Sequence, residues 1–389
     1  SECYNKSPAN RLEEYMSVNF ELIESELPDW HLTHYLEPNI SKVEIIPHLL
    51  HRLSTVRLPT DIQSDKSEFF RRSFNGYRRG TDHSNKFVYT DNQNEIKKRI
   101  TGWLTDDIPI DSYKLLPVAY KNHLNFVEND LNKKRITVIL NDLEMEAEGN
   151  KVTQVYEQQG EDLSVEIHYR KGLSTVELAE AFEENNNLIH YVGHCKNDGL
   201  NCPNGYLDIS TIDESNAETF VLNACSSYVQ GRELIKKGSV AGVVTIHDVV
   251  DSQAASVGKM FGRLLINGFS VQQALEMARN QIMLNKKYLV IGDGTHSIFF
   301  PNQVHPLKFE IEEISEERYI VQSDIDNPKS PGSSYKPDFK NKLTSHIGGK
   351  VSYFELDRKE LLSQLRNYEF PVKFKDTYYW SNELIEKIQ

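Results

Sequence analysis

The feature that most constrains this chain is a pair of short apolar stretches that each end in a chemically reactive residue. The first covers residues 188–195 and carries His194 near its end, and the second covers residues 220–227 and carries Cys225. Apolar runs of this length, bounded by polar or small residues, are typical of strands buried on both faces of a parallel sheet. Ligands bind at the carboxyl edge of such sheets, so we expect His194 and Cys225 to lie together there.

A thiol beside an imidazole is the smallest set of groups that supports nucleophilic cysteine catalysis. The imidazole of His194 can take the proton of Cys225 and give the sulfur thiolate character. Gly193 lets the chain turn before the histidine, and we expect the backbone N–H groups of Gly193, Cys195 and Cys225 to form the oxyanion hole. Ser226, the small residue after the thiol, is expected to line the substrate pocket. The competing interpretation is that Cys225 is a buried cysteine that packs as a small hydrophobe.

The segments around the two stretches alternate between strand and helix signals. We expect strands at residues 136–140, 163–167, 188–192, 220–224, 240–246 and 288–291. Helix signals separate them, including a capping box that starts at Ser174 and a helix end at Gly238. This alternation predicts an α/β fold, namely an α/β/α sandwich with a mostly parallel sheet.

The length of 389 residues is too great for one ordinary core, so we expect more than one domain. Residues 1–125 are expected to form an N-terminal accessory or regulatory domain, residues 126–303 the α/β unit, and residues 304–389 a small C-terminal α+β extension. The first part contains a basic and aromatic cluster at residues 69–80. We favour a solvated surface for this cluster over a site for phosphate or an acidic partner.

Composition excludes several classes of function. The net charge of −13 argues against direct nucleic-acid binding, and no apolar run is long enough to cross a membrane. Four cysteines in so long a chain do not make a disulfide framework, which favours a reducing, cytoplasmic location. His190, His194, Cys195 and Cys202 lie close in sequence, but they lack the spacings of short zinc motifs, so we expect no metal site.

Several ordered motifs resemble those of the CHAT domain, a caspase- and separase-related group of clan CD cysteine peptidases. The motifs lie at residues 191–194, 222–227, 238–244, 261–268, 274–279 and 291–293, within a stretch from 135 to 301. The resemblance implies a caspase-like fold for residues 126–303, a catalytic dyad of His194 and Cys225, and peptide-bond hydrolysis without a metal or organic cofactor. It also implies that the N-terminal domain at residues 1–125 is either pseudo-caspase-like or regulatory.

The same resemblance implies limited, regulated cleavage of a dedicated protein partner. Relatives of this kind act in bacterial or archaeal defence and in cell-death signalling, with a pore-forming gasdermin as a typical target and a regulatory protein as a second partner. One departure concerns Cys195, because the family usually has glycine directly after the histidine. Its side chain would crowd the oxyanion site or supply a second thiol, so oxidative pairing of Cys195 with Cys225 is a hypothesis for switching the enzyme off.

Substrate preference is expected to depend on residues 247–251, which follow the strand at 240–246. Asp248 and Asp251 would favour Arg or Lys before the cleaved bond, as in separase- and gingipain-like enzymes, rather than the Asp preferred by caspases. The alternative is that Asp251 caps the following helix and Asp248 is structural. Two other functions remain open for the chain: a catalytically silent CHAT-like interaction module, and a different thiol enzyme such as an acyltransferase.

Overall fold

A computed structural model covers the chain and describes most of its second half. The described residues are 7, 10, 32–35, 54–57, 87–88, 100–104, 108–109, 112–128, 134–160, 165–246, 251–279, 288–298, 306–325, 334–335, 346–347, 352–367 and 369–388. The basic and aromatic cluster at 69–80 lies outside them.

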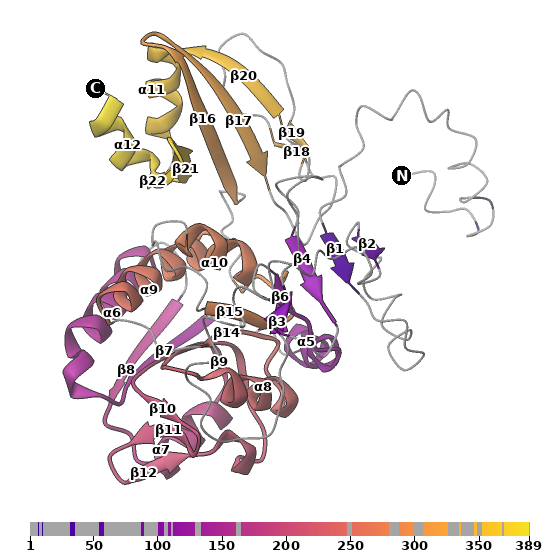
Figure 1. Ribbon diagram of the computed structural model, residues 1–389, viewed down its shortest axis with the longest axis vertical. Coiled ribbons are helices and arrows are strands. Elements are labelled where there is room, and N and C mark those ends of the chain that lie inside the picture. The colour runs from indigo at the N-terminus through magenta and orange to yellow at the C-terminus, as the bar shows by residue number, and fades with distance from the viewer. Residues whose placement is uncertain are drawn as a thin grey trace.

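A ten-stranded sheet forms the centre of the molecule (Figure 1). In spatial order its strands are β2 (Ser54–Arg57), β1 (Leu32–Tyr35), β4 (Ile100–Trp103), β6 (Tyr113–Lys114), β15 (Tyr288–Gly292), β14 (Ala241–Thr245), β13 (Ala217–Asn223), β9 (Asn186–Val192), β7 (Lys134–Leu140) and β8 (Val165–Lys171). Neighbouring strands run parallel, except that β15 is antiparallel to β14. The predicted mostly parallel sheet is therefore confirmed.

Helices cover both faces of this sheet. On one face lie α6 (Glu146–Gly160), α9 (Asp251–Ile266) and α10 (Val271–Arg279), and on the other lie α5 (Val118–Glu128), α7 (Thr175–Glu183) and α8 (Tyr228–Lys237). Successive residues of a strand point to opposite faces, so Val221 packs in the first layer while Phe220 and Leu222 pack in the second. This burial on both sides explains the continuous apolar runs and confirms the α/β/α sandwich. None of the helices in the described part of the chain has the length and apolar character needed to cross a bilayer.

Part of the segment expected to form an N-terminal domain joins the same sheet. The strands β2, β1, β4 and β6 continue it on the side of β15, where Ile291 pairs with Lys114. Two further short strands, β3 (Phe87–Val88) and β5 (Ile108–Pro109), pair with each other. The division of the chain at residue 125 stays a prediction.

The predicted capping residues lie at the ends of helices in the structure. Ser174 and Glu177 form the expected capping box at the start of α7, and Gly238 ends α8 with a φ of 143° that favours glycine. After β9, the chain forms a separate three-stranded antiparallel sheet of β10 (Cys195–Lys196), β11 (Gly199–Cys202) and β12 (Gly205–Leu207). Short 3-10 helices lie at Leu143–Met145 and Ile209–Thr211.

The C-terminal extension is an α+β unit, as expected. Its sheet has the order β20 (Ser352–Asp357), β17 (Arg318–Ile325), β16 (Leu307–Ser315), β21 (Pro371–Phe374) and β22 (Thr377–Trp380). The helices α11 (Arg358–Asn367) and α12 (Ser381–Ile388) pack on one face of it. The strands β18 (Ser334–Tyr335) and β19 (His346–Ile347) form a separate pair.

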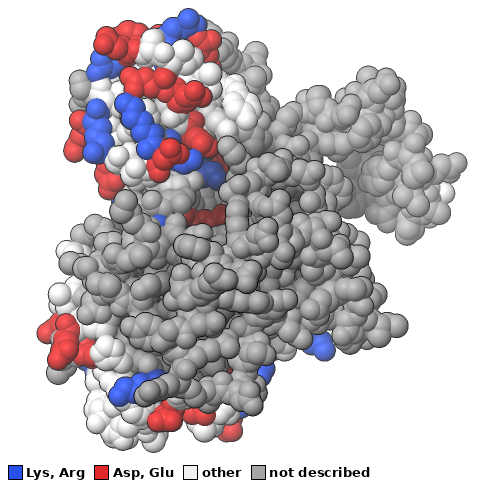
Figure 2. Space-filling model, viewed as in Figure 1, with Lys and Arg blue, Asp and Glu red and all other residues white. Residues whose placement is uncertain are grey.

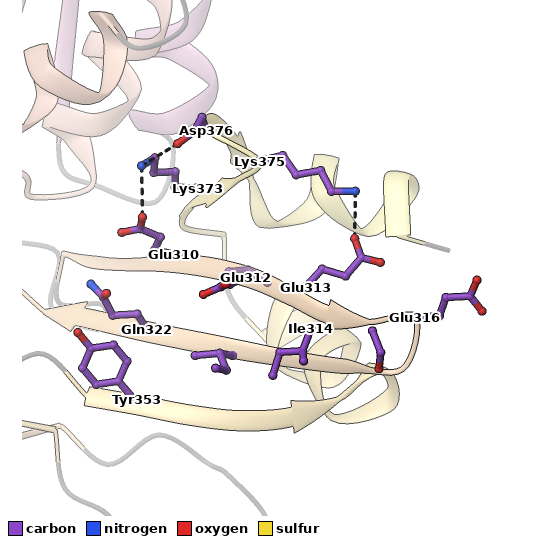
Figure 3. Close-up of a pocket in the computed structure, with 13 residues that line it drawn as sticks. Glu310, Glu312, Glu313, Ile314, Glu316, Gln322, Tyr353, Lys373, Lys375 and Asp376 are labelled. Atoms are coloured by element: carbon purple, nitrogen blue, oxygen red, sulfur yellow. Dashed lines mark hydrogen bonds and ion pairs between the residues drawn. The ribbon is translucent and has the colours of Figure 1, made fainter.

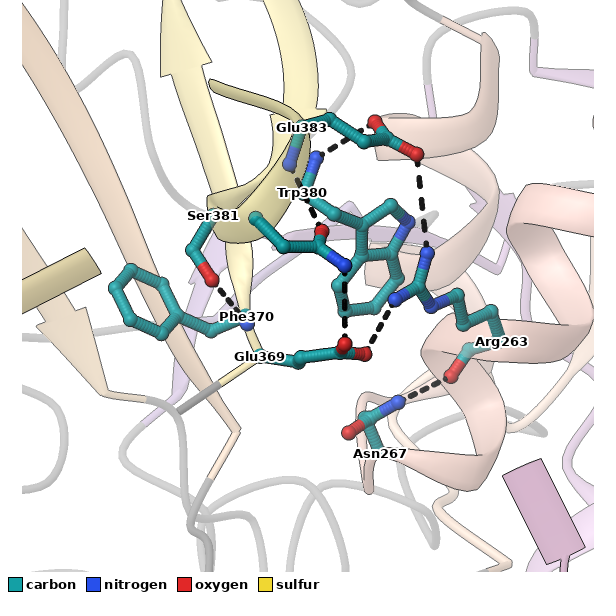
Figure 4. Close-up of polar contacts among 8 residues, drawn as sticks. Arg263, Asn267, Glu369, Phe370, Trp380, Ser381 and Glu383 are labelled. Carbon is teal, nitrogen blue, oxygen red and sulfur yellow. Dashed lines mark hydrogen bonds and ion pairs between the residues drawn. The ribbon is translucent and has the colours of Figure 1, made fainter. Parts of the chain in front are cut away.

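The C-terminal unit is attached to α9 by a cluster around one arginine (Figure 4). The Arg263 guanidinium lies 3.7 Å from the centroid of the Trp380 ring and 2.5 Å from a carboxylate oxygen of Glu369. A second carboxylate, from Glu383, lies 3.9 Å away. The Trp380 ring is itself buried in the core formed with α9 and α10. A cation–π contact and ion pairs at one point therefore hold the two units together.

Candidate active site

Three neighbouring strands of the sheet end at the same level. Val192, the last residue of β9, pairs with Leu140 at the end of β7 and with Asn223 at the end of β13. The N–H of Asn141 donates to the carbonyl of Val192 at 3.0 Å, which extends the β7–β9 ladder by one residue. The three loops that leave these strands therefore begin side by side at the carboxyl edge.

The second residue beyond each of these strand ends carries a reactive or charged side chain. They are Asp142 after β7, His194 after β9 and Cys225 after β13. The structure thus places the predicted histidine and cysteine on adjacent parallel strands at one edge of the sheet, as the sequence led us to expect. Asp142 is the third member of the group, and no sequence motif had singled it out.

Asp142 holds the imidazole directly. Its Oδ2 lies 2.7 Å from Nε2 of His194, and its other oxygen accepts from the backbone N–H of Glu144 at 2.9 Å. The His194 side chain is half exposed, with 51% of its surface accessible, while that of Asp142 is only 13% exposed. A carboxylate in this position fixes the ring orientation and stabilises the imidazolium that forms when the histidine takes a proton. With Nε2 engaged, Nδ1 is the ring nitrogen left for proton exchange with a thiol.

The turn that carries Cys225 is fastened to the neighbouring strand β14. The hydroxyl of Thr245 donates to the carbonyl of Ala224 at 2.5 Å, and the backbone N–H of Thr245 donates to Oγ of Ser227 at 3.0 Å. The Ser227 hydroxyl in turn donates to the carbonyl of Leu222 at 3.1 Å. All of these groups are buried, so they fix the turn on both sides of the thiol.

The residue after the thiol has an unusual backbone conformation. Ser226 has a φ of 56°, in the left-handed region that non-glycine residues rarely adopt. Strain of this kind is concentrated at functional sites, where the surrounding structure maintains it. The turn then leads into α8, whose first residue is Tyr228.

The backbone N–H of Gly193 is already engaged. It donates to the carbonyl of Asn223 at 3.3 Å and so continues the β9–β13 ladder. Of the expected oxyanion donors, Gly193 is thus bonded within the sheet in this structure. The roles of the Cys195 and Cys225 N–H groups as oxyanion donors stay predictions.

The packing of Tyr191 also explains why residue 193 is a glycine. A side chain there would meet the ring of Tyr191, whose hydroxyl oxygen would lie only 2.8 Å from the added carbon. The same hydroxyl donates to the carbonyls of His194 and Asn201 at 3.1 and 2.8 Å. Tyr191 therefore supports the backbone of His194, and the absence of a side chain at Gly193 makes room for its ring.

Cys195 packs inward beside the site. Its side chain belongs to the same apolar cluster as Ala224, and its thiol donates to the carbonyl of Lys196 at 3.5 Å. Burial, together with the nearby Cys225, raises the pKa of the Cys195 thiol to about 12. Cys195 and Cys225 are both reduced in the structure. Their oxidative pairing stays a prediction.

These environments predict a clear order of thiol reactivity towards iodoacetamide at pH 7.5. Burial also raises the pKa of Cys202, to about 11, so both Cys195 and Cys202 stay protonated at this pH. The thiolate is the reacting form, and Cys225 is the more exposed residue, so we expect its labelling to be at least about tenfold faster. Site-resolved peptide mass spectrometry over time measures this. Equal labelling of Cys195 and Cys225 would contradict it.

The structure describes only some of the residues expected to line the substrate pocket. Asp248 lies outside the described residues. Asp251 begins α9, but its side chain is not among the described ones. Ser226 is exposed directly beside the thiol. The pocket roles of all three residues stay predictions.

His190, one of the residues considered for zinc, lies on the other side of the sheet. Its ring is fully buried, Nδ1 lies 3.1 Å from the hydroxyl of Tyr156 on α6, and burial lowers its pKa to about 3. Cys195 and Cys202 pack in the opposite layer. Within the described part of the chain, no group of three or more metal-ligating side chains comes together.

Comparisons with known proteins give matches among solved structures only. No protein-family model matches the chain, and no curated protein sequence does. The Arg specific cysteine proteinase gingipain R aligns over 76% of this chain and 85% of its own, with 13% identity and a TM-score of 0.43. A complex of Porphyromonas gingivalis RgpB pro- and mature domains aligns over 84% and 99%, with 11% identity and a TM-score of 0.47.

A third similar structure is the Saccharomyces cerevisiae separase–securin complex. It aligns over 50% of this chain but only 16% of the matched chain, with 14% identity and a TM-score of 0.37. At identities this low, a likeness between structures concerns the fold alone.

Proposed function

We propose that the chain is a cysteine endopeptidase of the CHAT type. Cys225 acts as the nucleophile, His194 as the proton carrier and Asp142 as the residue that orients His194. The observation that carries this proposal is the alignment of these three residues at one sheet edge, with the carboxylate 2.7 Å from the imidazole. A nucleophile, a base and a group that orients the base are the parts that acyl transfer requires.

The proposed reaction has two stages. The Cys225 sulfur attacks the carbonyl carbon of the scissile bond, and backbone N–H groups of Cys195 and Cys225 stabilise the oxyanion. His194 takes the proton of the Cys225 thiol and gives it to the leaving amine as the C–N bond breaks, and a thioester on Cys225 remains. His194 then takes a proton from water as the water oxygen attacks the thioester, and returns it to the Cys225 sulfur as the C–S bond breaks and the acid product leaves.

The proposed substrate is a protein partner cut at few sites after Arg or Lys. Asp248, Asp251 and Ser226 would form the pocket, with the carboxylates pairing with the basic side chain. The motif resemblance supports a cytoplasmic role in bacterial or archaeal defence or cell-death signalling, with a target such as a gasdermin and a regulatory partner.

Peptidyl chloromethyl ketones that differ only in the residue before the warhead test this proposal. We expect the Arg and Lys reagents to label Cys225 at least about tenfold faster than the Asp reagent, because a carboxylate pocket repels Asp. Intact and peptide mass spectrometry identify the modified residue, and cleavage of matched peptide amides measures turnover.

Two outcomes would separate the parts of the proposal. Preference for the Asp reagent would overturn the proposed carboxylate pocket and leave the peptidase. Absence of both labelling and cleavage would overturn the peptidase in favour of a silent interaction module.

A further inference from the structure

In the described part of the C-terminal unit, α11 and α12 cover one face of the sheet, and neither helix covers the other. Phe309, Ile311 and Val321 point towards α11 and α12 and form the core of the unit. Side chains alternate along a strand, so Glu310 and Ile320 point to the other face. That face contains a hollow of about 580 Å³, mainly along β16 and β17 (Figure 3).

The hollow continues a face that already makes contacts between the two units. Lys308, on the same side of β16, is paired with Asp324 at 3.2 Å and lies close enough to Glu276 of α10 for their charges to interact. Tyr378 of β22 pairs with Lys373 across the sheet and packs into the core beside α9 and α10. One end of the face is thus covered by the α/β unit, while the hollow is open.

Negative charge dominates the lining of the hollow. The charged residues there are Glu310, Glu312, Glu313, Glu316, Asp376, Lys373 and Lys375. Both lysines are already in ion pairs with carboxylates of the lining, at 3.0 to 3.3 Å. Figure 2 shows acidic and basic side chains gathered on the visible face of this unit. Within the described part of the chain, Glu312 and Glu316 have no ion pair.

Exposed apolar side chains line the same hollow. Tyr353 is 68% exposed and Ile314 is 54% exposed, which makes them two of the large apolar residues that the described surface leaves open. The Tyr353 ring also offers a face to a cation. A surface that is only acidic and solvated has no reason to expose such large apolar side chains. The hollow combines carboxylates with apolar side chains, and this combination suits a peptide.

We propose that this hollow binds a basic, extended peptide segment of a protein partner. Its Lys or Arg side chains would pair with Glu312 and Glu316, and an apolar side chain between them would lie against Tyr353 and Ile314. The charge of the face disfavours nucleic acid and anionic membranes. This site is separate from Cys225, so the proposal does not depend on peptidase activity.

The test uses the full chain carrying Cys225→Ala, so that cleavage of the probe cannot interfere. The probe is a fluorescent ten-residue peptide of alternating Arg and Val, with a peptide of alternating Glu and Val as its counterpart. Anisotropy measures binding at several salt concentrations. We expect the Arg peptide alone to bind, with an affinity that falls as salt rises.

Variants separate the hollow from the general negative charge of the chain. Glu312→Gln/Glu316→Gln should weaken binding of the Arg peptide at least about tenfold, because two charge-assisted pairs are lost. The matched control Glu180→Gln/Glu386→Gln removes the same charge from the exposed surfaces of α7 and α12 and should change binding less than about twofold. Tyr353→Ala should weaken binding and leave its salt dependence unchanged. Equal loss in both double variants, or no binding by the parent, would overturn the proposal.

Discussion

Replacing Cys225 with alanine should abolish peptide-bond hydrolysis, lowering kcat/KM by at least about 10⁴-fold. The sulfur is the only protein atom in the proposed reaction that bonds to the substrate carbon, so no neighbouring side chain replaces it. Hydrolysis of an Arg-ending peptide amide, followed over hours at high enzyme concentration, measures the remaining rate.

Cys202→Ala is the matched control, because it removes a nearby thiol, 3.6 Å from Nδ2 of Asn141, that lies outside the proposed machinery. Cys202 is buried, so thermal unfolding of both variants should be compared with the parent. Activity should stay within about threefold of the parent for Cys202→Ala. A Cys225→Ala variant that keeps its cleavage activity would rule out Cys225 as the nucleophile.

Replacing Asp142 with asparagine should lower kcat by about 10² to 10³-fold and leave KM within about twofold. The amide has the same size, but it carries no charge and offers an N–H₂ group to Nε2 of His194. The ring then loses the partner that fixes its orientation and stabilises its protonated form. The split between kcat and KM distinguishes this role from a part in substrate binding.

Asp213→Asn provides the comparison, because Asp213 is exposed and lies before β13, away from the carboxyl edge. It should behave like the parent. If Asp142→Asn kept full kcat, the 2.7 Å contact with His194 would be structural, and the site would work as a dyad.

The sequence was sufficient to predict the central sheet and the positions of His194 and Cys225 at its edge, for physical reasons. Strands buried on both faces must be apolar throughout, so β9 and β13 were visible as runs, and the residues after them were expected at the carboxyl edge. Helix ends such as those at Ser174 and Gly238 were visible because their signals are local.

Other features depend on contacts that no local pattern contains. The residues Asn141 and Asp142 are of types found in turns of every kind. Only the structure shows that β7 and β9 end at the same level, so that Asp142 contacts His194. The antiparallel direction of β15 was missed because apolar periodicity is the same for either direction. Arg263 and Glu369 are 106 residues apart, so their pairing was not visible in the sequence.

Helix α9 connects the C-terminal unit to the sequence that precedes the helix. This helix has 16 residues and is therefore about 24 Å long, and it begins at Asp251, the last residue of the segment expected to select substrate. Arg263, in its last turn, is held by Glu369 and the ring of Trp380. One continuous helix therefore joins the contact with the C-terminal unit to the segment expected to select substrate. Cutting away residues 304–389 would remove that contact and uncover the apolar surface beneath Trp380.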